Sequence, residues 1–506
     1  MVILQLQPLT VAHLQDEKYL KRRENHISHT AYYHSNSPSC LPYLPLHMDF
    51  LIRFGGVHES FRLVEIQALA IVENVRMEVV FYNADSPFCI VKLDSSAAAA
   101  ALISRSILSQ SIHELWAMGD DYAALHADTK TRSAHLWPAH EKASWRFDVD
   151  SYRGARNQDA IVSIINSFAY LPLRGPIRMR GADTELTVME HWAHDAVPLG
   201  LEHPERLYLA RKVASSPRND LIRKYDLKKR RYISTTSMDS ELALVTANIA
   251  LAAPGRLFYD PFVGTGSFPV AAAQWGALAW GSDIDGRAVR GDEGGVGGKT
   301  LRGNFEQYGL LHGLADSFSA DLTNSPVVRC QLGSGGGGRR WLDGIICDPP
   351  YGVREGLRVL GVRDAEKQAH VVKAGMNMYR DPDFIPPKRP YSFLAMLDDL
   401  LTFAAETLID GGRLAFWMPT ANDESLELAV PTHPCMRTVA VCVQVFNKWS
   451  RRLITYERIP DNQVDTEALA LALANRDAGE GEQGTTADEL NPFRRGYFTK
   501  FKTEEK

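Results

Sequence analysis

The feature that most constrains this chain is a short apolar run, residues 344–347, that stops abruptly at a carboxylate and two prolines. Such a run is typical of a strand buried inside a parallel sheet. Pro349 and Pro350 cannot donate backbone hydrogen bonds, so we expect the strand to end there. Open α/β sheets bind ligands at the carboxyl ends of their strands. The sequence therefore predicts a functional site at Asp348 and Tyr351, with a plain Pro-Pro turn as the alternative.

A glycine-rich turn farther upstream lies between the kinds of segment that flank a nucleotide-binding turn. We expect a strand before this turn and a helix after it, with Gly264 and Gly266 in between. A strand, a glycine turn and a helix in this order begin a doubly wound sheet and cradle a nucleotide, although glycines can also serve a turn alone. Carboxylates at further strand ends can bind ribose hydroxyls or simply hold a turn. The candidate cofactor residues are Asp260, Phe262, Gly264, Gly266, Asp283 and Asp321.

The nucleotide cradle and the Asp-Pro-Pro-Tyr motif together favour one kind of reaction. A phosphate-binding loop needs a lysine where this chain has Ser267-Phe268. Asp260, before the turn, suits a positively charged cofactor such as S-adenosylmethionine, which has an amine, a ribose and an adenine. An exocyclic amine on a planar base is a poor nucleophile, and a carboxylate that accepts its N–H bonds while an aromatic ring stacks on the base can activate it. We expect methyl transfer without a metal, with catalytic residues Asp348, Pro349, Pro350 and Tyr351.

Length and local patterns predict several domains. A chain of 506 residues is too long for one ordinary core, so roughly two to four domains are expected. A β-α-β-β-α pattern indicates a ferredoxin-like unit, and an imperfect capping box at Ser237 indicates the start of a long helix. The predicted divisions are a mobile extension (1–45), the ferredoxin-like unit (46–127), a second small α+β module (128–205), a basic linker (206–236), the catalytic domain (237–459) and a mostly mobile tail (460–506).

Positive charge is concentrated locally. The formal net charge is −5, so the composition gives no general signature for nucleic acid. Residues 200–235 hold ten Lys or Arg against four Asp or Glu, and we expect phosphate contacts there, with a solvated linker or a nuclear-import signal as alternatives. An arginine-rich loop at 172–180 could equally be ordinary solvated surface. The candidate RNA-binding residues are Arg174, Arg178, Lys228, Lys229, Arg230 and Arg231.

Cysteine spacing and hydropathy bear on the compartment. The six cysteines lack the close spacing of a zinc or redox site, so reduced thiols in an intracellular protein are the simplest interpretation. No apolar run approaches the roughly 18 residues that a membrane span needs, and the N-terminus lacks a secretory signal pattern. We therefore expect a cytoplasmic protein with no membrane segment.

Four segments together resemble one family. Residues 230–242, 260–267, 281–287 and 348–356 are similar to the eukaryotic tRNA guanine N2-methyltransferase catalytic subunit, most specifically in the string DPPYGVREG. The resemblance implies a ferredoxin-like and a THUMP module before a class I, Rossmann-like methyltransferase domain with a mixed, mostly parallel sheet. It also implies S-adenosylmethionine as cofactor, the guanine at position ten of tRNA as substrate, and a heterodimer with a small zinc-binding activator.

The resemblance places the cofactor and catalytic roles on the candidates already named, apart from Phe262. It adds Arg354, which would meet a phosphate or brace its loop. Glycine-rich insertions at 294–299 and 334–340 depart from the family pattern and leave its motifs intact. The strand order usual for methyltransferases puts residues 314–320 at a sheet edge, where we expect the activator to add a strand.

Two other functions stay open at this point. A DNA adenine N6-methyltransferase can use the same Asp-Pro-Pro-Tyr chemistry, but the two accessory modules and the basic segment favour structured RNA. A non-catalytic RNA-binding scaffold with an inactive methyltransferase fold is disfavoured by the intact Asp260, Asp283 and Asp348.

Overall fold

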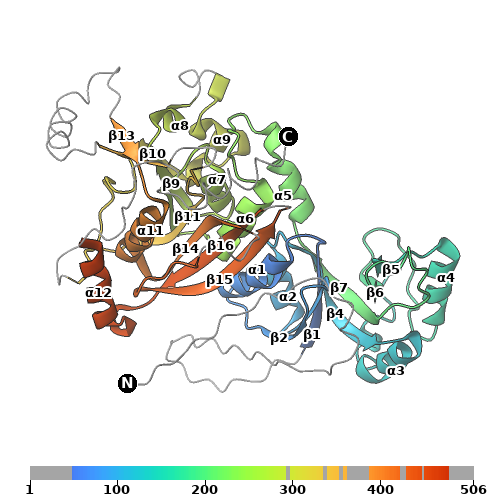
Figure 1. Cartoon of the computed structure of the whole chain (residues 1–506). Helices are drawn as coiled ribbons and strands as arrows, with labels where there is room; N and C mark the ends of the chain where they lie inside the picture. The colour runs from blue at the N-terminus through green and yellow to red at the C-terminus, as the bar shows by residue number, and fades with distance from the viewer. Residues whose placement is uncertain are drawn as a thin grey trace. The chain divides into compact units, whose positions relative to one another are not determined.

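The computed structural model describes residues 48–291, 297–333, 339–352, 357–361, 387–421, 429–446 and 449–477 (Figure 1). The predicted extension at 1–45, Arg354 and much of the two glycine-rich insertions lie outside these residues. Two large sheets organise the described chain, one from its N-terminal part and one from its C-terminal part. None of the helices in these ranges is long and apolar enough to cross a membrane.

The first sheet runs from a ferredoxin-like unit into a second α+β module without a break. The chain order β1-α1-β2-β3-α2-β4 is that of a ferredoxin-like unit. The sheet order is β2 (Glu78–Tyr82), β3 (Phe88–Leu93), β1 (Met48–Phe54), β4 (Ser109–Gly119), β7 (Arg206–Ser215), β6 (Thr184–His191) and β5 (Trp145–Tyr152). The accompanying helices are α1 (Glu59–Val72), α2 (Ser96–Ile103), α3 (Tyr122–Arg132), η1 (Trp137–Ala139) and α4 (Gln158–Ser167).

The structure corrects the predicted linker at residues 206–236. Its first ten residues form β7, which pairs antiparallel with both β4 and β6 and lies inside the first sheet. Leu207 and Leu209 are fully buried there. The basic residues of this strand that suggested a linker pair instead with acids distant in sequence, as in Arg211–Glu114 (2.8 Å) and Lys212–Glu185 (3.4 Å). A count of local charge cannot detect partners supplied by other strands.

The second sheet is mixed and mostly parallel, as predicted. Its order is β10 (Leu314–Ser319), β9 (Leu278–Asp283), β8 (Leu257–Asp260), β11 (Leu342–Cys347), β14 (Leu408–Ala421), β16 (Trp449–Arg458) and β15 (Met436–Val445). The pairs from β10 to β14 are parallel, and β16 is antiparallel to both of its neighbours. The chain leaves β8 toward β9 and β10, and then returns to β11 on the other side of β8. Such a switch point is where open α/β sheets bind ligands.

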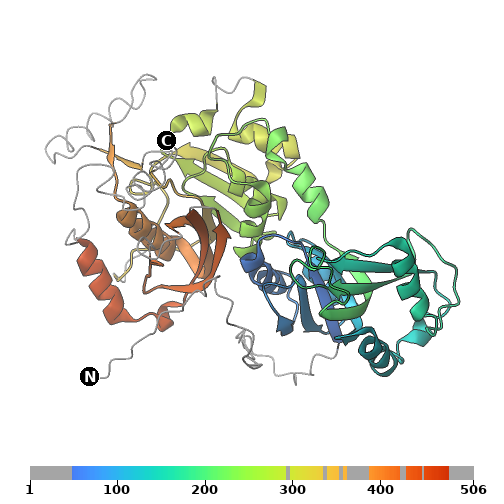
Figure 2. The same ribbon diagram turned by 45° about the vertical axis from the view of Figure 1, so that its right-hand side comes forward.

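Helices cover both faces of this sheet. The elements are α5 (Arg218–Lys224), η2 (Leu227–Lys229), α6 (Ser240–Ile249), α7 (Ser267–Gln274), α8 (Gly286–Arg290), α9 (Leu301–Tyr308), η4 (Leu311–Gly313), α11 (Phe393–Thr407), η6 (Asp461–Gln463) and α12 (Thr466–Asp477), with a short ribbon of β12 (Arg358–Leu360) and β13 (Lys388–Pro390). Helices α6 and α7 share one buried core with Ala415 and Trp417, and α11 shares the other with the alternate residues Leu414 and Phe416. Figure 2 shows helices on both faces of the sheet. The alternation of β14 therefore divides the two cores.

Two predicted boundaries are wrong. The helix expected from Ser237 begins at Ser240, because the Asp239 carboxylate caps it by accepting hydrogen bonds from the backbone N–H groups of Glu241 (3.0 Å) and Leu242 (3.2 Å). The tail expected to be mobile from residue 460 instead forms η6 and α12, up to Asp477. Ion pairs of Asp461 with Arg340 and Arg458 hold the start of this segment.

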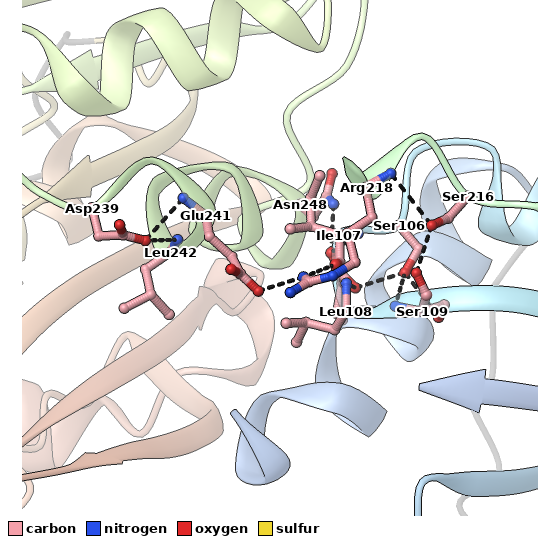
Figure 3. A network of polar contacts seen from close by, with 11 residues as sticks. Ser106, Ile107, Leu108, Ser109, Ser216, Arg218, Asp239, Glu241, Leu242 and Asn248 are labelled. Atoms are coloured by element: carbon pink, nitrogen blue, oxygen red, sulfur yellow. Dashed lines mark hydrogen bonds and ion pairs between the residues drawn. The ribbon is translucent and has the colours of Figure 1, made fainter. Parts of the chain in front are cut away.

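A buried polar network joins the first sheet's helices to those of the second. The Glu65 carboxylate on α1 accepts hydrogen bonds from the amides of Ile107 (2.9 Å) and Leu108 (3.0 Å) and from Asn248 Nδ2 (2.8 Å) on α6. Figure 3 shows the adjoining contacts, in which Arg218 donates to the Ile107 carbonyl oxygen and to Glu241. These contacts fasten the helix that precedes the glycine turn to the N-terminal module.

One further contact links α1 to the edge of the second sheet. The Ser60 hydroxyl donates to the carbonyl oxygen of Val443 on β15 and accepts from the amide of the same residue, both at 2.9 Å. A single side chain thus satisfies both backbone groups of one residue on this edge strand.

Candidate active site

The strand that carries the Asp-Pro-Pro-Tyr motif is buried and tightly packed. Ile345, Ile346 and Cys347 of β11 are at most 2% exposed. Gly344 lies so close to Phe258 of β8 that a Cβ atom there would be 2.2 Å from its ring. Parallel pairing with β8 and β14 then delivers the motif to the carboxyl edge of the sheet. Packing therefore fixes where Asp348 emerges.

Asp348 and Tyr351 meet in this structure. The Tyr351 hydroxyl donates a hydrogen bond to Asp348 Oδ1, and both side chains are partly buried. Burial raises the pKa of Tyr351 well above its usual value, the charge of Asp348 adds to the effect, and Arg451 opposes it. Tyr351 therefore stays a neutral hydrogen-bond donor. Asp348 thus already accepts a hydrogen bond from the Tyr351 hydroxyl, and we expect a substrate amine to bind at the same carboxylate.

The glycine turn has the backbone that only glycine adopts easily. Gly264 has φ +48° and Gly266 has φ +84°, both in the left-handed region. The Asp283 carboxylate, from the end of β9, accepts hydrogen bonds from the backbone N–H groups of Gly264 (3.0 Å) and Asp285 (2.8 Å). Asp283 thus ties two strand ends together, which is the turn-holding role that the sequence left open as the alternative to ribose binding.

Asp260 is the most unusual carboxylate of the site. It is 3% exposed and accepts a hydrogen bond from the Phe262 amide at 2.9 Å. Burial raises the pKa of Asp260 well above its usual value, and the charges of Asp283 and Asp348 add to the shift. The structure therefore brings the glycine turn and the Asp-Pro-Pro-Tyr motif into electrostatic contact. Three converging carboxylates favour a positively charged ligand between them.

Asp321 performs the role of a turn carboxylate. It is 5% exposed and accepts hydrogen bonds from Thr323 Oγ1 (2.7 Å), the Asn324 amide (2.8 Å) and the Leu360 amide (2.8 Å). The last bond ties ribbon strand β12 to the end of β10. Lys388, on the partner strand β13, donates to the Ile284 carbonyl oxygen at 3.2 Å. The ribbon is therefore fastened at the ends of β9 and β10, a feature that the sequence analysis missed.

The predicted RNA-binding residues divide into two groups. Arg174 and Arg178 are exposed on the loop before β6, where Arg174 forms an ion pair with Glu141 at 3.1 Å. Lys228, Lys229 and Arg231 are exposed beside α9 of the catalytic domain, where the Arg231 amide donates to Gln307 Oε1.

The structure corrects the prediction for Arg230. Its side chain is only 8% exposed, and it donates to Ser267 Oγ at 2.9 Å. It turns inward to the glycine turn, away from the surface where a phosphate could reach it.

Arg451 on β16 is a residue that the sequence analysis missed. Its guanidinium lies 4.7 Å from the ring centroid of Trp417, its Nε donates to Gln444 at 2.6 Å, and its charge reaches Tyr351. Nothing in the local sequence could have identified it, because β14 and β16 come together only in the sheet. Among the described residues, no group of His, Cys, Asp or Glu is arranged to hold a metal ion.

A doubly wound, mostly parallel sheet with a glycine turn after β8 and Asp-Pro-Pro-Tyr after β11 defines a class I methyltransferase. A family model described as the Tmrp11 THUMP N-terminal domain matches residues 48–218. The tRNA (guanine(10)-N(2))-methyltransferase of Saccharomyces cerevisiae is 40% identical over 80% of this chain and 92% of its own length. The enzyme of that name from Schizosaccharomyces pombe is 34% identical over 81% and 90%. The chain therefore belongs to the tRNA (guanine(10)-N(2))-methyltransferase family.

Among solved structures, that of TrmN from Thermus thermophilus has a TM-score of 0.39 and 17% identity, covering 81% of this chain and 100% of that chain.

Proposed function

We propose that this chain is the catalytic subunit that transfers a methyl group from S-adenosylmethionine to the exocyclic N2 amine of guanine 10 in tRNA. The observation that carries the proposal is the parallel pairing of β8 with β11 at the switch point, which places Asp260 of the nucleotide turn and Asp348 of the amine-activating motif at neighbouring strand ends. Membership of the family supports the choice of tRNA over DNA and the choice of an enzyme over an inactive scaffold.

Asp348 acts on the target amine. The lone pair of an exocyclic amine is delocalised into the base, so its N–H bonds must be drawn toward acceptors before the nitrogen can attack. Asp348 and a proline carbonyl oxygen serve as these acceptors, and the ring of Tyr351 stacks on the base and fixes its approach. As the nitrogen–carbon bond forms, one amine proton passes to Asp348 directly or through water.

The residues around the glycine turn fit S-adenosylmethionine, which supplies an electrophilic methyl group on a sulfonium. The cofactor is cationic at sulfur and at its amine, and the convergence of Asp260, Asp283 and Asp348 supplies the negative charge that favours such a ligand. The left-handed Gly264 and Gly266 keep the turn free of side chains where the cofactor approaches. Asp283 would also serve the ribose, whereas Asp321 would act through the turn and ribbon that it holds.

Exposed basic groups hold the tRNA. Lys228, Lys229 and Arg231 lie beside the catalytic domain and Arg174 and Arg178 lie on the N-terminal module, so the two groups would contact phosphates at separate places on one RNA. The expected cytoplasmic location stays a prediction.

A small zinc-binding activator adds a strand to β10. This strand lies at the edge of the second sheet, where it pairs with β9 alone among the described strands. The Ala320 amide donates to Asp283 on the inner side, so the Ser319 amide faces outward. Leu278 (42% exposed), the first residue of β9, and Leu311 (37% exposed), in η4 just before β10, offer apolar surface to a partner.

The decisive assay uses methyl-labelled cofactor, the chain with its activator, and three substrates: tRNA, duplex DNA and protein. We expect label in tRNA alone. A tRNA with inosine at position ten is the matched control, because inosine lacks the exocyclic N2 amine and should accept no label there. Label in duplex DNA would support the adenine methyltransferase instead, and no label in any substrate despite cofactor binding would support the scaffold.

A further inference from the structure

The segment that enters the catalytic domain alternates between exposed and buried side chains over residues 229–232. Lys229 and Arg231 are exposed, whereas Arg230 is 8% exposed and Tyr232 is 4% exposed. The residues that we propose to contact RNA phosphates are therefore the immediate chain neighbours of a side chain packed under the cofactor turn.

Arg230 contacts the turn directly. Its guanidinium donates to Ser267 Oγ at 2.9 Å and to the Gly266 carbonyl oxygen at 3.5 Å. Both acceptors belong to the junction where the left-handed Gly266 starts helix α7. Arg230 thus contacts the backbone at the end of the glycine turn, where Gly266 sets the conformation of the turn.

The burial of Arg230 is costly for folding. Within the described residues its buried Nε has no hydrogen-bond partner, and the neighbouring groups that favour its charge are the hydroxyls of Tyr308 and Tyr225 rather than carboxylates. Burial lowers the pKa of Arg230, which means that the environment disfavours its charged form. A buried cation held by a hydroxyl and a carbonyl oxygen contributes little to stability, and an apolar side chain of similar volume would serve the fold as well.

Asn304 on α9 fastens the same segment to the turn. Its Nδ2 donates to the carbonyl oxygens of Tyr232 (2.8 Å) and Thr265 (2.9 Å), and its Oδ1 accepts from the Tyr232 amide at 3.0 Å. Ser237 Oγ and Thr265 Oγ1 lie 2.9 Å apart farther along the segment. Hydrogen bonds at Tyr232 and Ser237 therefore connect this segment to the glycine turn.

We propose that Arg230 is a positioning residue that sets the cofactor turn according to RNA contact at its neighbours Lys229 and Arg231, so that tRNA and cofactor bind cooperatively. This inference rests on the proposed function. Because coupling of this kind is reciprocal, the cofactor product should strengthen tRNA binding by the same factor as tRNA strengthens binding of that product.

The test measures the dissociation constant of S-adenosylhomocysteine by calorimetry on the chain with its activator, with and without saturating tRNA. In the wild-type protein we expect tRNA to tighten binding roughly 5- to 150-fold, the usual range of such coupling. Arg230→Met should weaken binding about tenfold without RNA and bring the coupling factor close to one, while thermal stability stays equal or rises. Arg230→Lys, which keeps a donor, should restore part of both.

Arg302→Met is the matched control, because Arg302 is an exposed arginine on α9 that pairs with Glu306. It should change neither affinity nor coupling. The inference is overturned if Arg230→Met keeps wild-type affinity and coupling, if the wild-type protein shows no coupling, or if all losses follow a fall in thermal stability. A wild-type protein that binds no S-adenosylhomocysteine would instead overturn the proposed function.

Discussion

At the scale of single residues, two carboxylates of the site, Asp348 and Asp260, have different surroundings and therefore different roles. Asp348 is partly exposed and bonded to the Tyr351 hydroxyl, whereas Asp260 is buried and its pKa is raised well above the usual value. The first is suited to accept a proton from a substrate, and the second to attract a cation.

Replacing Asp348 with Asn should separate chemistry from binding. Asn keeps the size of the side chain but cannot take up a proton, so methylation of tRNA should fall by roughly two to four orders of magnitude, the scale of one acid–base group. Single-turnover assays and calorimetry with S-adenosylhomocysteine would measure the two effects. Near-normal turnover in this variant would show that Asp348 has another role.

Asp260→Asn should stabilise the fold and weaken cofactor binding. Because the folded-state pKa of Asp260 is raised above an unfolded value of about 3.9, ionisation in the folded state opposes folding as the pH rises from there toward the folded-state pKa. The melting temperature of the variant should match the wild type near pH 4 and exceed it increasingly as the pH rises toward the folded-state pKa. A difference that does not depend on pH would exclude this explanation.

The residues of the site were largely predictable, but their roles were not. Asp348, Gly264 and Gly266 lie in motifs whose spacing indicates strand ends, and the sheet brings those ends together. Arg230 stood in a run of four basic residues, and only three-dimensional packing shows that it alone turns inward. Asn304 belongs to no local motif, because its partners lie 39 and 72 positions earlier in the chain.

At the scale of elements, β10 is the feature that the sequence located best. The predicted edge strand at 314–320 corresponds to Leu314–Ser319 at the edge of the second sheet. Strand β7 was the least predictable element, because its charges find their partners on β4 and β6. Motifs are enough to place β10 in the strand order usual for methyltransferases. Whether a charged strand such as β7 is buried depends on which strands pair with it, and the local sequence does not show that.

Proline at the outward-facing Ser319 should block the activator. It removes an amide that faces away from β9, so an added strand would lose a ladder hydrogen bond while pairing with β9 is kept. Co-purification of the activator should be lost and S-adenosylhomocysteine binding should remain measurable. Ser319→Ala, which keeps the amide, is the control. If hydrogen exchange of the β10 amides does not slow in a verified complex, the activator docks elsewhere.

At the scale of the whole molecule, one buried network connects the module matched by the THUMP family model to the catalytic domain. Asn248, fully buried, gives hydrogen bonds to Glu65 Oε1 and to the Arg105 carbonyl oxygen, and its Oδ1 accepts from Arg105 Nε at 3.0 Å. A substrate held by one module is therefore presented to the other through a junction with little room for adjustment.

Asn248→Ala should loosen this junction. Glu65 loses a donor and Arg105 loses an acceptor in a buried place, so the free energy of unfolding should fall by roughly 2–5 kcal/mol. Denaturant titration would measure the loss, and tRNA methylation should fall more than S-adenosylhomocysteine binding does. Asn219→Ala, on the exposed side of α5, is the control. Unchanged stability in Asn248→Ala would mean that packing alone holds the modules together.

The hydroxyl of Ser60 has a consequence for how this protein can be divided. It occupies both backbone groups of Val443 on β15, next to a stripe in which Val441 (39% exposed), Val443 (36%) and Val445 (72%) show apolar side chains. A catalytic half expressed from residue 237 onward would offer this strand to other copies as an open template. We expect such a fragment to accumulate as insoluble aggregates, and a charged substitution such as Val443→Lys to recover soluble material in a sedimentation assay. The N-terminal module would then also protect the catalytic domain against aggregation.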